Sequence, residues 1–487
     1  MHPNEIIDVF WFKRDLRLVD NDALNEAITS KNKLLPVYLY EPSIWQDAHY
    51  DERHYRFIFE SIQDLDNDLL YETKILAVQS EVIPFFKTLS DLYQIENIFS
   101  TEETGLDITY RRDIEFQDFC FTNGIRWSQF QNNGVVRGLT DRSSWRKDWY
   151  NYMNLPQKDF ETKHTNFIGH KTISDLYVRF DALQEPSKRS KFQKGGRKEA
   201  LRWQSSFFEE RIAFYSDYIS KPELSRYGCS RLSPYFAWGN LSIREVYQKA
   251  VELKKISSYK KQLNAFMSRL RWQSHFIQKF EMEPRIEFEA FNKAFLSLEQ
   301  PINDSYINAW TEGGTGYPLV DAAIRCVVQT GYINFRMRAM IVSFLTHHLF
   351  QHFTTVGPWL ARQFLDFEPG IHYGQMQMQA GFTGINTVRV YNPTKNAMDH
   401  DSDAIFIKKY VPELSGLPTG LAIEPWKVTA MDSEMYGFNY GVDYPERIVN
   451  ISDTRRMALQ KLYGQRKSEF AQLERQRILE THTIPRN

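Results

Sequence analysis

The chain has 487 residues, with 60 Lys and Arg against 61 Asp and Glu, so its formal net charge at pH 7 is −1. This length exceeds what one hydrophobic core usually serves and predicts two domains. The balanced charge excludes binding to nucleic acid through overall charge, so such a contact would need a local basic surface.

Three cysteines, Cys120, Cys229 and Cys326, lie far apart and form no CxxC pair. They predict neither a disulfide framework nor a metal site, and they are too few for a four-cysteine iron–sulfur cluster. The first residues, MHPNEIID, lack the features of a signal peptide, and the apolar runs are too short for a membrane span. We therefore expect a cytoplasmic protein with no membrane contact.

Short apolar runs rich in β-branched residues predict strands at residues 6–12, 34–40, 74–78, 95–100 and 125–130. Helical patterns such as those at 53–70 and 82–93 separate these runs. The alternation predicts a doubly wound, Rossmann-like parallel sheet over residues 1–130. No GxGxxG follows the first strand, so a dinucleotide site is not predicted there.

The segment KRDLR at residues 13–17 is interpreted as a solvated loop, with an anion site at the strand ends as the alternative.

Residues 131–196 are polar, aromatic-rich and turn-rich, and we interpret them as an interdomain linker. They end in a basic run that includes Lys188, Arg189 and Lys194 and continues to Arg197. This run is either a solvated linker or a loop that contacts phosphate. Residues 197–487 show helical spacing and predict an all-α domain, whose tail from 452 to 480 is one charged helix.

Arg338 opens an otherwise apolar helical stripe, and a buried guanidinium needs an anionic or bidentate partner. Asp366 and Glu368 follow one helix later, and His372 and the amide-rich run 375–379 come next. This order predicts a pocket for a large polar cofactor.

A second motif is GCSRLSPYFAWGNLSIR at residues 228–244. Ser230, Arg231 and Ser233 precede a helix and could form a cradle for a diphosphate. The same residues could serve only as a helix cap.

These motifs, the segment WTEGGTGYPLVDAAIR that begins at Trp310, and the opening DVFWFKRDLRLVDNDAL together closely resemble the photolyase/cryptochrome family. The resemblance covers nearly the whole chain and is to bacterial-type members without the iron–sulfur cluster. It implies an antenna-type α/β domain, which could hold a folate or deazaflavin chromophore, and a helical domain that binds FAD. It also implies a monomer that acts on UV-damaged DNA.

Several positions match the family's FAD contacts, and the resemblance assigns them to cofactor binding: Tyr215, Ser230, Arg231, Leu232, Ser233, Gln273, Arg338, Asp366, Glu368 and His372. In the family an arginine and an aspartate pair across the isoalloxazine, and these match Arg338 and Asp366. Glu368 stands where the family has aspartate. His372 faces flavin N5 by this match, where many photolyases have asparagine.

The electron-transfer chain departs from the family pattern. Of the three tryptophans that carry electrons to the flavin, only the outer one is kept, as Trp310, while the others match Phe353 and Met376.

The lesion pocket departs as well. A tryptophan that flanks the flipped dimer matches Trp272, but the family's glutamate is Arg269 and its second pocket tryptophan is Met378. We assign catalytic roles to Trp272, and to His275 and His372 as proton donors.

Three hypotheses follow. The first is a deoxyribodipyrimidine photo-lyase that repairs pyrimidine dimers by photoinduced electron transfer from FAD. The second is a cryptochrome that signals through FAD without repairing DNA. The third is a flavoprotein with no light function.

Overall fold

The computed structural model describes residues 5–69, 73–158, 166–186 and 191–484. The chain divides into two compact units. Unit 1 comprises residues 1–208, 231–284 and 365–371, and unit 2 comprises 209–230, 285–364 and 372–487. The domain boundaries at residues 130 and 196 stay predictions.

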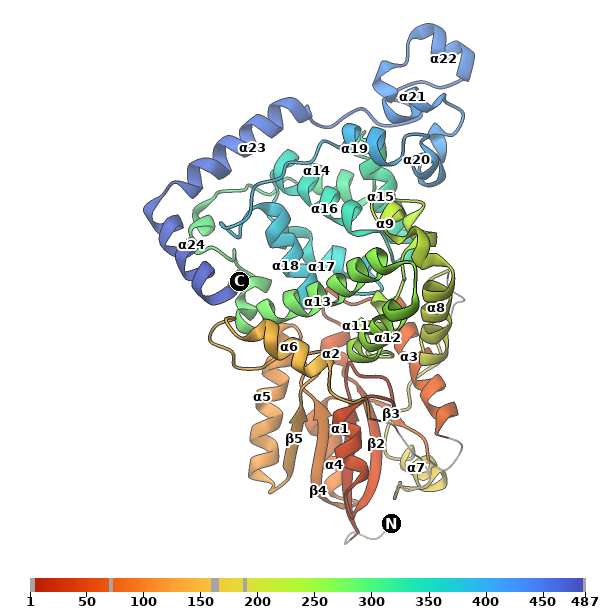
Figure 1. Cartoon of the computed structure of the whole chain (residues 1–487), viewed down its shortest axis with the longest axis vertical. Coiled ribbons are helices and arrows are strands. Elements are labelled where there is room, and N and C mark those ends of the chain that lie inside the picture. The colour runs from red at the N-terminus through yellow and green to blue at the C-terminus, as the bar shows by residue number, and fades with distance from the viewer. Residues whose placement is uncertain (1–4, 70–72, 159–165, 187–190, 485–487) are drawn as a thin grey trace. The chain divides into compact units, whose positions relative to one another are not determined.

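Unit 1 contains a five-stranded parallel sheet with strand order β3-β2-β1-β4-β5 (Figure 1). The strands are β1 (Ile6–Phe12), β2 (Lys33–Tyr40), β3 (Leu76–Gln79), β4 (Gln94–Thr101) and β5 (Arg126–Phe130). The predicted doubly wound sheet is confirmed. The order reverses at β1, so β1 and β4 flank the point where such sheets place ligands beyond the carboxyl ends of their strands.

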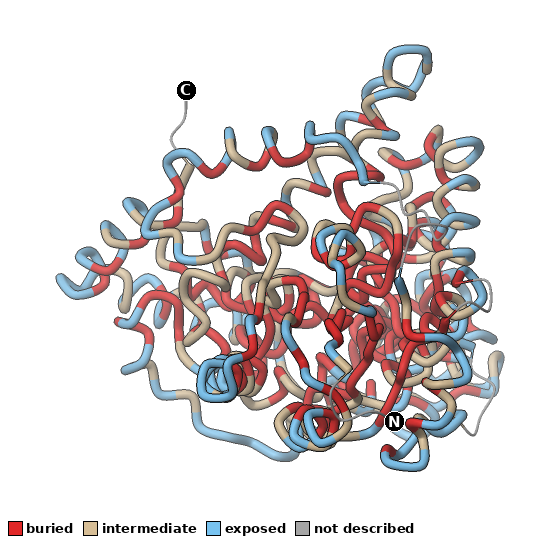
Figure 2. The backbone as a smooth tube through the Cα atoms, turned by 90° about the horizontal axis from the view of Figure 1, so that it is seen from below, coloured by how far each residue is buried: buried red, intermediate tan, exposed pale blue. Residues whose placement is uncertain are grey.

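The side chains of the central strand β1 alternate between its two faces, and those from Ile7 to Phe12 are all buried, so both faces of the strand are covered. Ile7, Val9 and Trp11 pack into a core with residues of α4 (Val82–Ser90) and α5 (Asp107–Thr122). Figure 2 shows the resulting pattern, with buried residues along the inner segments and exposed ones at the outer turns.

The helices of unit 1, besides α4 and α5, are α1 (Asp22–Ile28), α2 (Pro42–Trp45), α3 (Glu52–Asp68), α6 (Trp145–Met153), α7 (His170–Leu176), α8 (Arg197–Glu209), α11 (Ser233–Ala237), α12 (Ile243–Ile256) and α13 (Lys260–Met282). Two of them, α6 and α7, lie in the segment that we interpreted as an irregular linker. Helix α6 buries Trp145, Trp149 and Met153. Their spacing of four residues is the signal that the sequence analysis missed.

The interpretation of KRDLR as a solvated loop is wrong. Lys13, Asp15 and Arg17 are all buried. The Lys13 ammonium group lies 2.8 Å from Asp113, and Arg17 donates to the carbonyl oxygen of Gly239 at 3.2 Å. The segment directly follows the central strand β1, so neighbouring elements cover it. Ion pairs then take the place of hydration for its charged side chains.

The later part of the basic run is also anchored. Arg197 pairs with Glu245 at 2.7 Å, and the amide of Lys198 donates to Asp64 at 2.9 Å. Lys188 and Arg189 lie outside the described residues.

Unit 2 is helical, and the described residues after Gly196 contain no strand, as predicted. Its elements are η2 (Arg211–Phe214), α9 (Tyr215–Tyr218), α10 (Ser225–Gly228), η3 (Pro284–Glu287), η4 (Lys293–Ser297), α14 (Asp304–Thr311), α15 (Pro318–Thr330), α16 (Phe335–Ser343), η5 (Phe344–His348), α17 (Phe353–Gln363), α18 (Pro369–Ala380), α19 (Pro393–His400), α20 (Ile405–Tyr410), η6 (Pro412–Leu414), α21 (Thr419–Ile423), η7 (Pro425–Lys427), α22 (Ala430–Tyr436), α23 (Ile451–Arg466) and α24 (Glu469–His482). Residues 369–371 of α18 belong to unit 1.

Two features of unit 2 differ from the expectation. The charged tail is two helices, because Ser468 accepts a hydrogen bond from the amide of Ala471 and caps α24. The predicted Arg338 helix continues from α16 into the π-helical turn η5. None of the helices that the described residues form is long and apolar enough to cross a membrane.

Candidate functional site

A small cavity in unit 2 lies beside α16 and α18. Its polar lining comes from Arg338, His372, Gln375 and Gln379, and apolar side chains including Met376 complete it. The Arg338 guanidinium lies 3.8 Å from the centre of the Phe364 ring, and its Nε donates to the carbonyl oxygen of Ile333 at 3.3 Å. A guanidinium, an imidazole and two amides beside apolar walls could hydrogen-bond the polar edge of a heterocycle, although the volume of about 20 Å³ admits little more than a water molecule.

His372 is held by a defined hydrogen bond. Its Nε2 lies 2.9 Å from the carbonyl oxygen of Gly357, which can only accept, so Nε2 carries a proton. The neutral ring therefore has an unprotonated Nδ1, and His372 can donate a proton from Nδ1 only as an imidazolium. Gly357 also permits close packing, because a Cβ there would lie 3.3 Å from the Tyr373 ring.

The segment 365–371 in unit 1 is anchored by Arg14. The Arg14 guanidinium donates to the carbonyl oxygens of Phe367 and Ala237 and lies 3.6 Å from the Glu368 carboxylate. Trp238 Nε1 donates to the carbonyl oxygen of Leu365 at 2.9 Å. Burial raises the pKa of Glu368 to about 7, although the attraction of Arg14 opposes the shift.

Arg338 belongs to unit 2 and Asp366 to unit 1, and their pairing stays a prediction.

Within unit 1, Arg231 adopts a left-handed backbone conformation with φ of 59° just before α11. Its guanidinium already has a partner within the chain, because Nη2 donates to Gln193 Oε1 at 2.7 Å. The Gln193 side-chain amide in turn donates to the Arg231 carbonyl oxygen at 3.0 Å. This conformation turns the chain sharply before α11, as a diphosphate cradle requires.

The other positions that the resemblance assigns to the FAD phosphates are divided between the two units. Leu232 precedes α11 and Ser233 begins it, while Ser230 lies in unit 2, where its carbonyl oxygen accepts a bond from Arg211 at 3.4 Å. Tyr215 is buried at the start of α9.

Helix α13 carries three of the predicted site residues. Trp272 is 44% exposed, and its ring lies 5.2 Å from that of His275. The His275 ring also lies 6.0 Å from the ring of Trp145. Arg269 is exposed on the same helix, and Gln273 is half-buried there. The structure thus brings Trp272 and His275 together at an aromatic surface.

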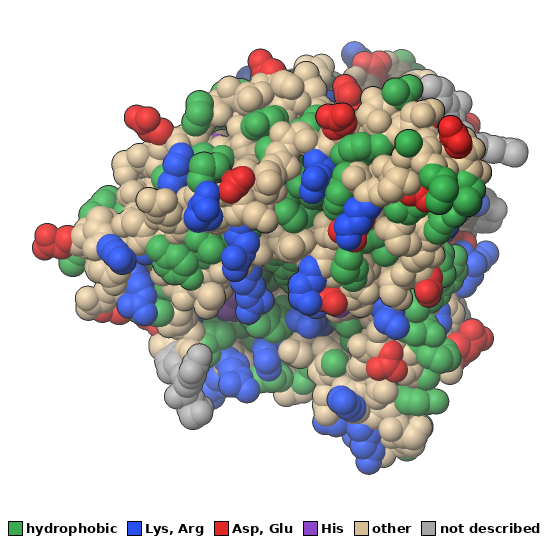
Figure 3. Space-filling model, turned by 90° about the horizontal axis from the view of Figure 1, so that it is seen from above, with side chains coloured by type: hydrophobic (Ala, Val, Ile, Leu, Met, Phe, Trp, Pro, Cys, Tyr) green, Lys and Arg blue, Asp and Glu red, His purple; other side chains and the backbone are tan. Residues whose placement is uncertain are grey.

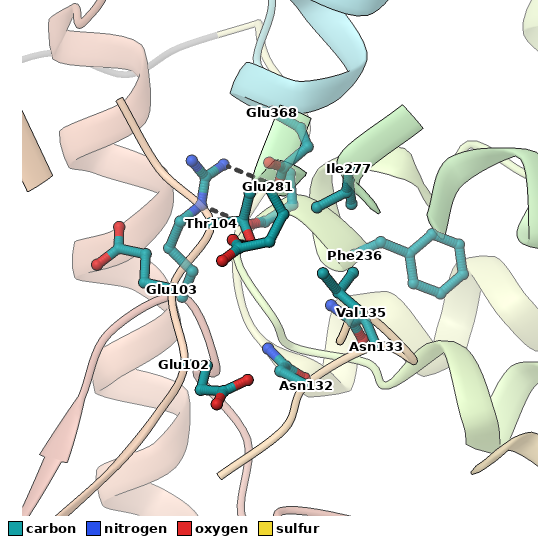
Figure 4. Close-up of a pocket in the computed structure, with 12 residues that line it drawn as sticks. Glu102, Glu103, Thr104, Asn132, Asn133, Val135, Phe236, Ile277, Glu281 and Glu368 are labelled. Carbon is teal, nitrogen blue, oxygen red and sulfur yellow. Dashed lines mark hydrogen bonds and ion pairs between the residues drawn. The ribbon is translucent and has the colours of Figure 1, made fainter. Parts of the chain in front are cut away.

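A second pocket lies within unit 1 and is lined largely by polar side chains (Figure 4). Its volume is about 40 Å³, and Arg14, Glu103, Glu281 and Glu368 contribute to its lining. Glu281 accepts hydrogen bonds from Tyr110 at 2.6 Å and from Arg137 at 3.2 Å. The sequence analysis assigned Glu368 to FAD binding but missed Glu103 and Glu281, although the position of Glu103 just after β4 was a signal for a ligand at this edge of the sheet.

The electron-transfer positions lie in unit 2. Trp310 is fully buried, and its ring lies 5.5 Å from that of the half-buried Trp359. Phe353 is buried beside Tyr373, with ring centres 6.3 Å apart, and Met376 is buried on α18.

Comparisons with known proteins show the family of the chain. A family model described as DNA photolyase matches residues 8–145, and one described as the FAD binding domain of DNA photolyase matches residues 266–464. The chain belongs to the photolyase/cryptochrome family.

Individual members of the photolyase/cryptochrome family align along nearly the whole chain. A deoxyribodipyrimidine photo-lyase of Buchnera aphidicola is 23% identical, covering 93% of this chain and 96% of that protein. A cryptochrome DASH of Gloeobacter violaceus is 24% identical, covering 91% and 92%. A Synechocystis cryptochrome structure superposes with a TM-score of 0.84 at 21% identity, covering 94% of this chain and all of that one. At these identities, repair members and cryptochromes are equally similar.

The match to the FAD-binding domain includes the α13 residues, Trp310, Arg338, Asp366, Glu368 and His372. Tyr215 and the residues 230–233 fall outside both matched segments. Their assignment to the FAD phosphates rests on the sequence motif and stays a prediction.

Proposed function

We propose that the protein is a light-dependent DNA photolyase that repairs pyrimidine dimers. When bound, reduced and excited by blue light, FAD supplies the electron that splits a cyclobutane dimer and then recovers it. The chain itself holds the cofactor through Arg338, Asp366 and His372. It also presents Trp272 to stack on the flipped lesion.

The observation that carries this proposal is the exposure of Trp272. An indole that is 44% exposed on a helix, beside His275 and Phe276, is costly to leave in water and is the kind of surface on which a flipped base stacks. Figure 3 shows Lys and Arg side chains on one face among hydrophobic and acidic ones, and contact with DNA phosphates depends on such cations.

The second candidate function is a cryptochrome photoreceptor. Specific departures favour it: Arg269 stands where the family's dimer-binding glutamate is expected, and Met378 replaces the second pocket tryptophan. In such a protein the light-dependent change at the flavin would alter the surface that a partner recognises, and no DNA lesion would be repaired.

We further propose that unit 1 holds an antenna chromophore of the folate type. The pocket of Figure 4 combines several carboxylates with one arginine, and carboxylates accept hydrogen bonds from the N–H groups of a pterin. Any anionic part of the chromophore, such as the phosphate of a deazaflavin or the glutamate of a folate, would have to lie outside these carboxylates. Fluorescence of the chromophores released from the purified protein tests the assignment, with a deazaflavin spectrum as the contrary result.

The deciding experiment is a repair assay. The purified protein, chemically reduced and lit with blue light, would be given oligonucleotides that carry a cyclobutane dimer or a 6-4 product in single and double strands. Chromatography measures the restored thymines. Trp272→Ala should reduce both lesion binding and repair, whereas Tyr259→Ala, which removes an exposed aromatic at the start of the same helix, should change neither. Bound, photoreducible FAD without repair of any lesion would favour the cryptochrome.

A further inference from the structure

Unit 2 contains a cavity that the flavin and lesion residues do not explain. Its volume is about 710 Å³, which lies within the range of sites for small organic ligands. Helices α16, α19 and α23 and the segment 389–392 line it, and its floor includes the buried His348.

Cations dominate this cavity. Arg336, Arg389, Lys395 and Arg455 line it, against a single carboxylate, Asp399. Lys395 and Asp399 pair with each other at 3.5 Å on the exposed face of α19. The three arginines have no carboxylate partner among the described residues, and Arg336 Nε is buried without a hydrogen-bond acceptor. Three guanidinium groups from separate elements therefore face the same space with uncompensated charge.

Two histidines respond to this charge. Burial lowers the pKa of His348 and His400, and the nearby Arg455 and Arg336, respectively, lower these values further. His348 Nε2 lies 2.8 Å from the carbonyl oxygen of Tyr391 and therefore carries its proton. Nδ1 lies 2.8 Å from the Thr454 hydroxyl. Because the His348 ring is neutral, the arginines are the groups that would meet an anion.

We propose that this cavity binds a nucleoside diphosphate. Arginine forks match phosphate oxygens in paired hydrogen bonds, so Arg389 and Arg455 suit the diphosphate. The remaining lining offers Tyr391 as an aromatic surface and Asn396 as an amide for the base. Arg389 and Arg455 are exposed, as a contact with nucleic-acid phosphates would also need, but they border a cavity whose lining includes the buried His348 and whose volume could admit a whole nucleotide.

The site is separate from the flavin cavity but shares a helix with it. On α16, Arg336 lines the basic cavity, while Arg338 and Ala339 line the cavity beside His372. The nucleotide would thus contact the opposite side of the helix that carries a flavin-site arginine.

The test is calorimetric titration of the FAD-loaded protein with ADP, inorganic pyrophosphate and adenosine. The bound FAD prevents ADP from entering the flavin site. We expect saturable binding of one ADP, weaker binding of pyrophosphate and no binding of adenosine. Arg389→Gln and Arg455→Gln should each weaken ADP about tenfold or more, because each removes a charge-assisted contact.

Arg456→Gln is the matched control. Arg456 neighbours Arg455 on α23 but pairs with Asp453 at 3.1 Å and does not line the cavity. It should leave ADP affinity unchanged. Absent ADP binding, or equal affinity in all three variants, would overturn the proposal. So would weakened DNA binding in the Arg389 and Arg455 variants without any ADP binding, because the arginines would then belong to a nucleic-acid surface.

Discussion

Glu368 is a buried carboxylate whose charge is only partly compensated by its neighbours. Its side chain is only 10% exposed, and one of its oxygens, Oε1, is buried without a hydrogen-bond donor. The other lies 3.6 Å from Arg14, which raises the stability of the ionised form but does not offset the cost of burial. The group therefore ionises near neutral pH, close to the candidate flavin residue Asp366 in the chain.

This shift makes stability depend on pH. The carboxyl ionises near 4.5 when unfolded and near 7 when folded. As pH rises through this window, the unfolded chain releases a proton that the folded chain keeps, so stability falls and then levels off above about 7. Glu368→Gln should match the natural protein near pH 4.5 and exceed its stability by about 1–3 kcal/mol at pH 8.

Unfolding by urea at both pH values measures this effect. Glu199→Gln, which removes one carboxylate from a surface pair with Arg202, serves as the control and should change the free energy of unfolding by less than about 1 kcal/mol. An equal stability difference at the two pH values would contradict the assigned titration.

Met376 stands where the family's electron-transfer chain has a tryptophan, so one substitution can restore that tryptophan. It is 1% exposed and lines the cavity that contains Arg338 and His372. Methionine is a poor station for electron hopping, whereas an indole is readily oxidised. Met376→Trp should therefore speed photoreduction of oxidised FAD in blue light with an external reductant, as followed by flavin absorbance. Met376→Phe controls for bulk, and equal rates in both variants would mean that the protein uses another path.

At the scale of elements, the turn between α11 and α12 shows how closely segments pack around KRDLR. Gly239 has φ of +76°, and a Cβ there would lie 2.3 Å from the carbonyl oxygen of Arg14 and 2.4 Å from the Asp15 Cα. Both contacts are with backbone, which cannot rotate away.

Gly239→Ala should lower the free energy of unfolding by about 3 kcal/mol, from left-handed strain and overpacking together. Gly124→Ala has a similar φ of +68° but meets nothing within 4 Å, so it should lose only about 1 kcal/mol, from strain alone. Denaturant unfolding of the two variants separates the cost of left-handed strain from the cost of overpacking. Equal losses would show that the close approach does not matter.

The elements that could be predicted are those with a local signal. The five strands follow apolar runs, and they appear within a few residues of the predicted bounds. The π-helical turn η5 could not be predicted, since its hydrogen bonding depends on packing in three dimensions. The break at Ser468 and the helix α6 carried local signals, a cap and a four-residue spacing, within sequence that otherwise looked uniformly polar.

The same distinction holds for the site across the whole molecule. Trp272 and His275 share one helix, so their proximity could be predicted from spacing alone. The carboxylate pocket could not, because Arg14, Glu103, Glu281 and Glu368 come from distant parts of the chain. The basic cavity of unit 2 likewise gathers arginines from three separate segments, none of which is basic enough to attract notice alone.

The net charge of −1 has a consequence for how the whole protein would recognise DNA. Contacts with phosphates weaken steeply as salt rises, for damaged and undamaged DNA alike. Stacking on Trp272 carries no charge, so it should set the ratio of the two affinities without adding to their salt dependence. We therefore predict that this ratio stays constant between low and physiological salt, while both affinities fall.

Trp272→Ala should reduce that ratio about tenfold or more, because base stacking contributes about 1–3 kcal/mol. It should leave the salt dependence unchanged. Fluorescence anisotropy with matched damaged and undamaged oligonucleotides measures both quantities in one titration series, and Tyr259→Ala provides the control. If the variant instead lost affinity for both DNAs equally, Trp272 would be part of a general binding surface. The protein would then lack the discrimination that a photolyase requires.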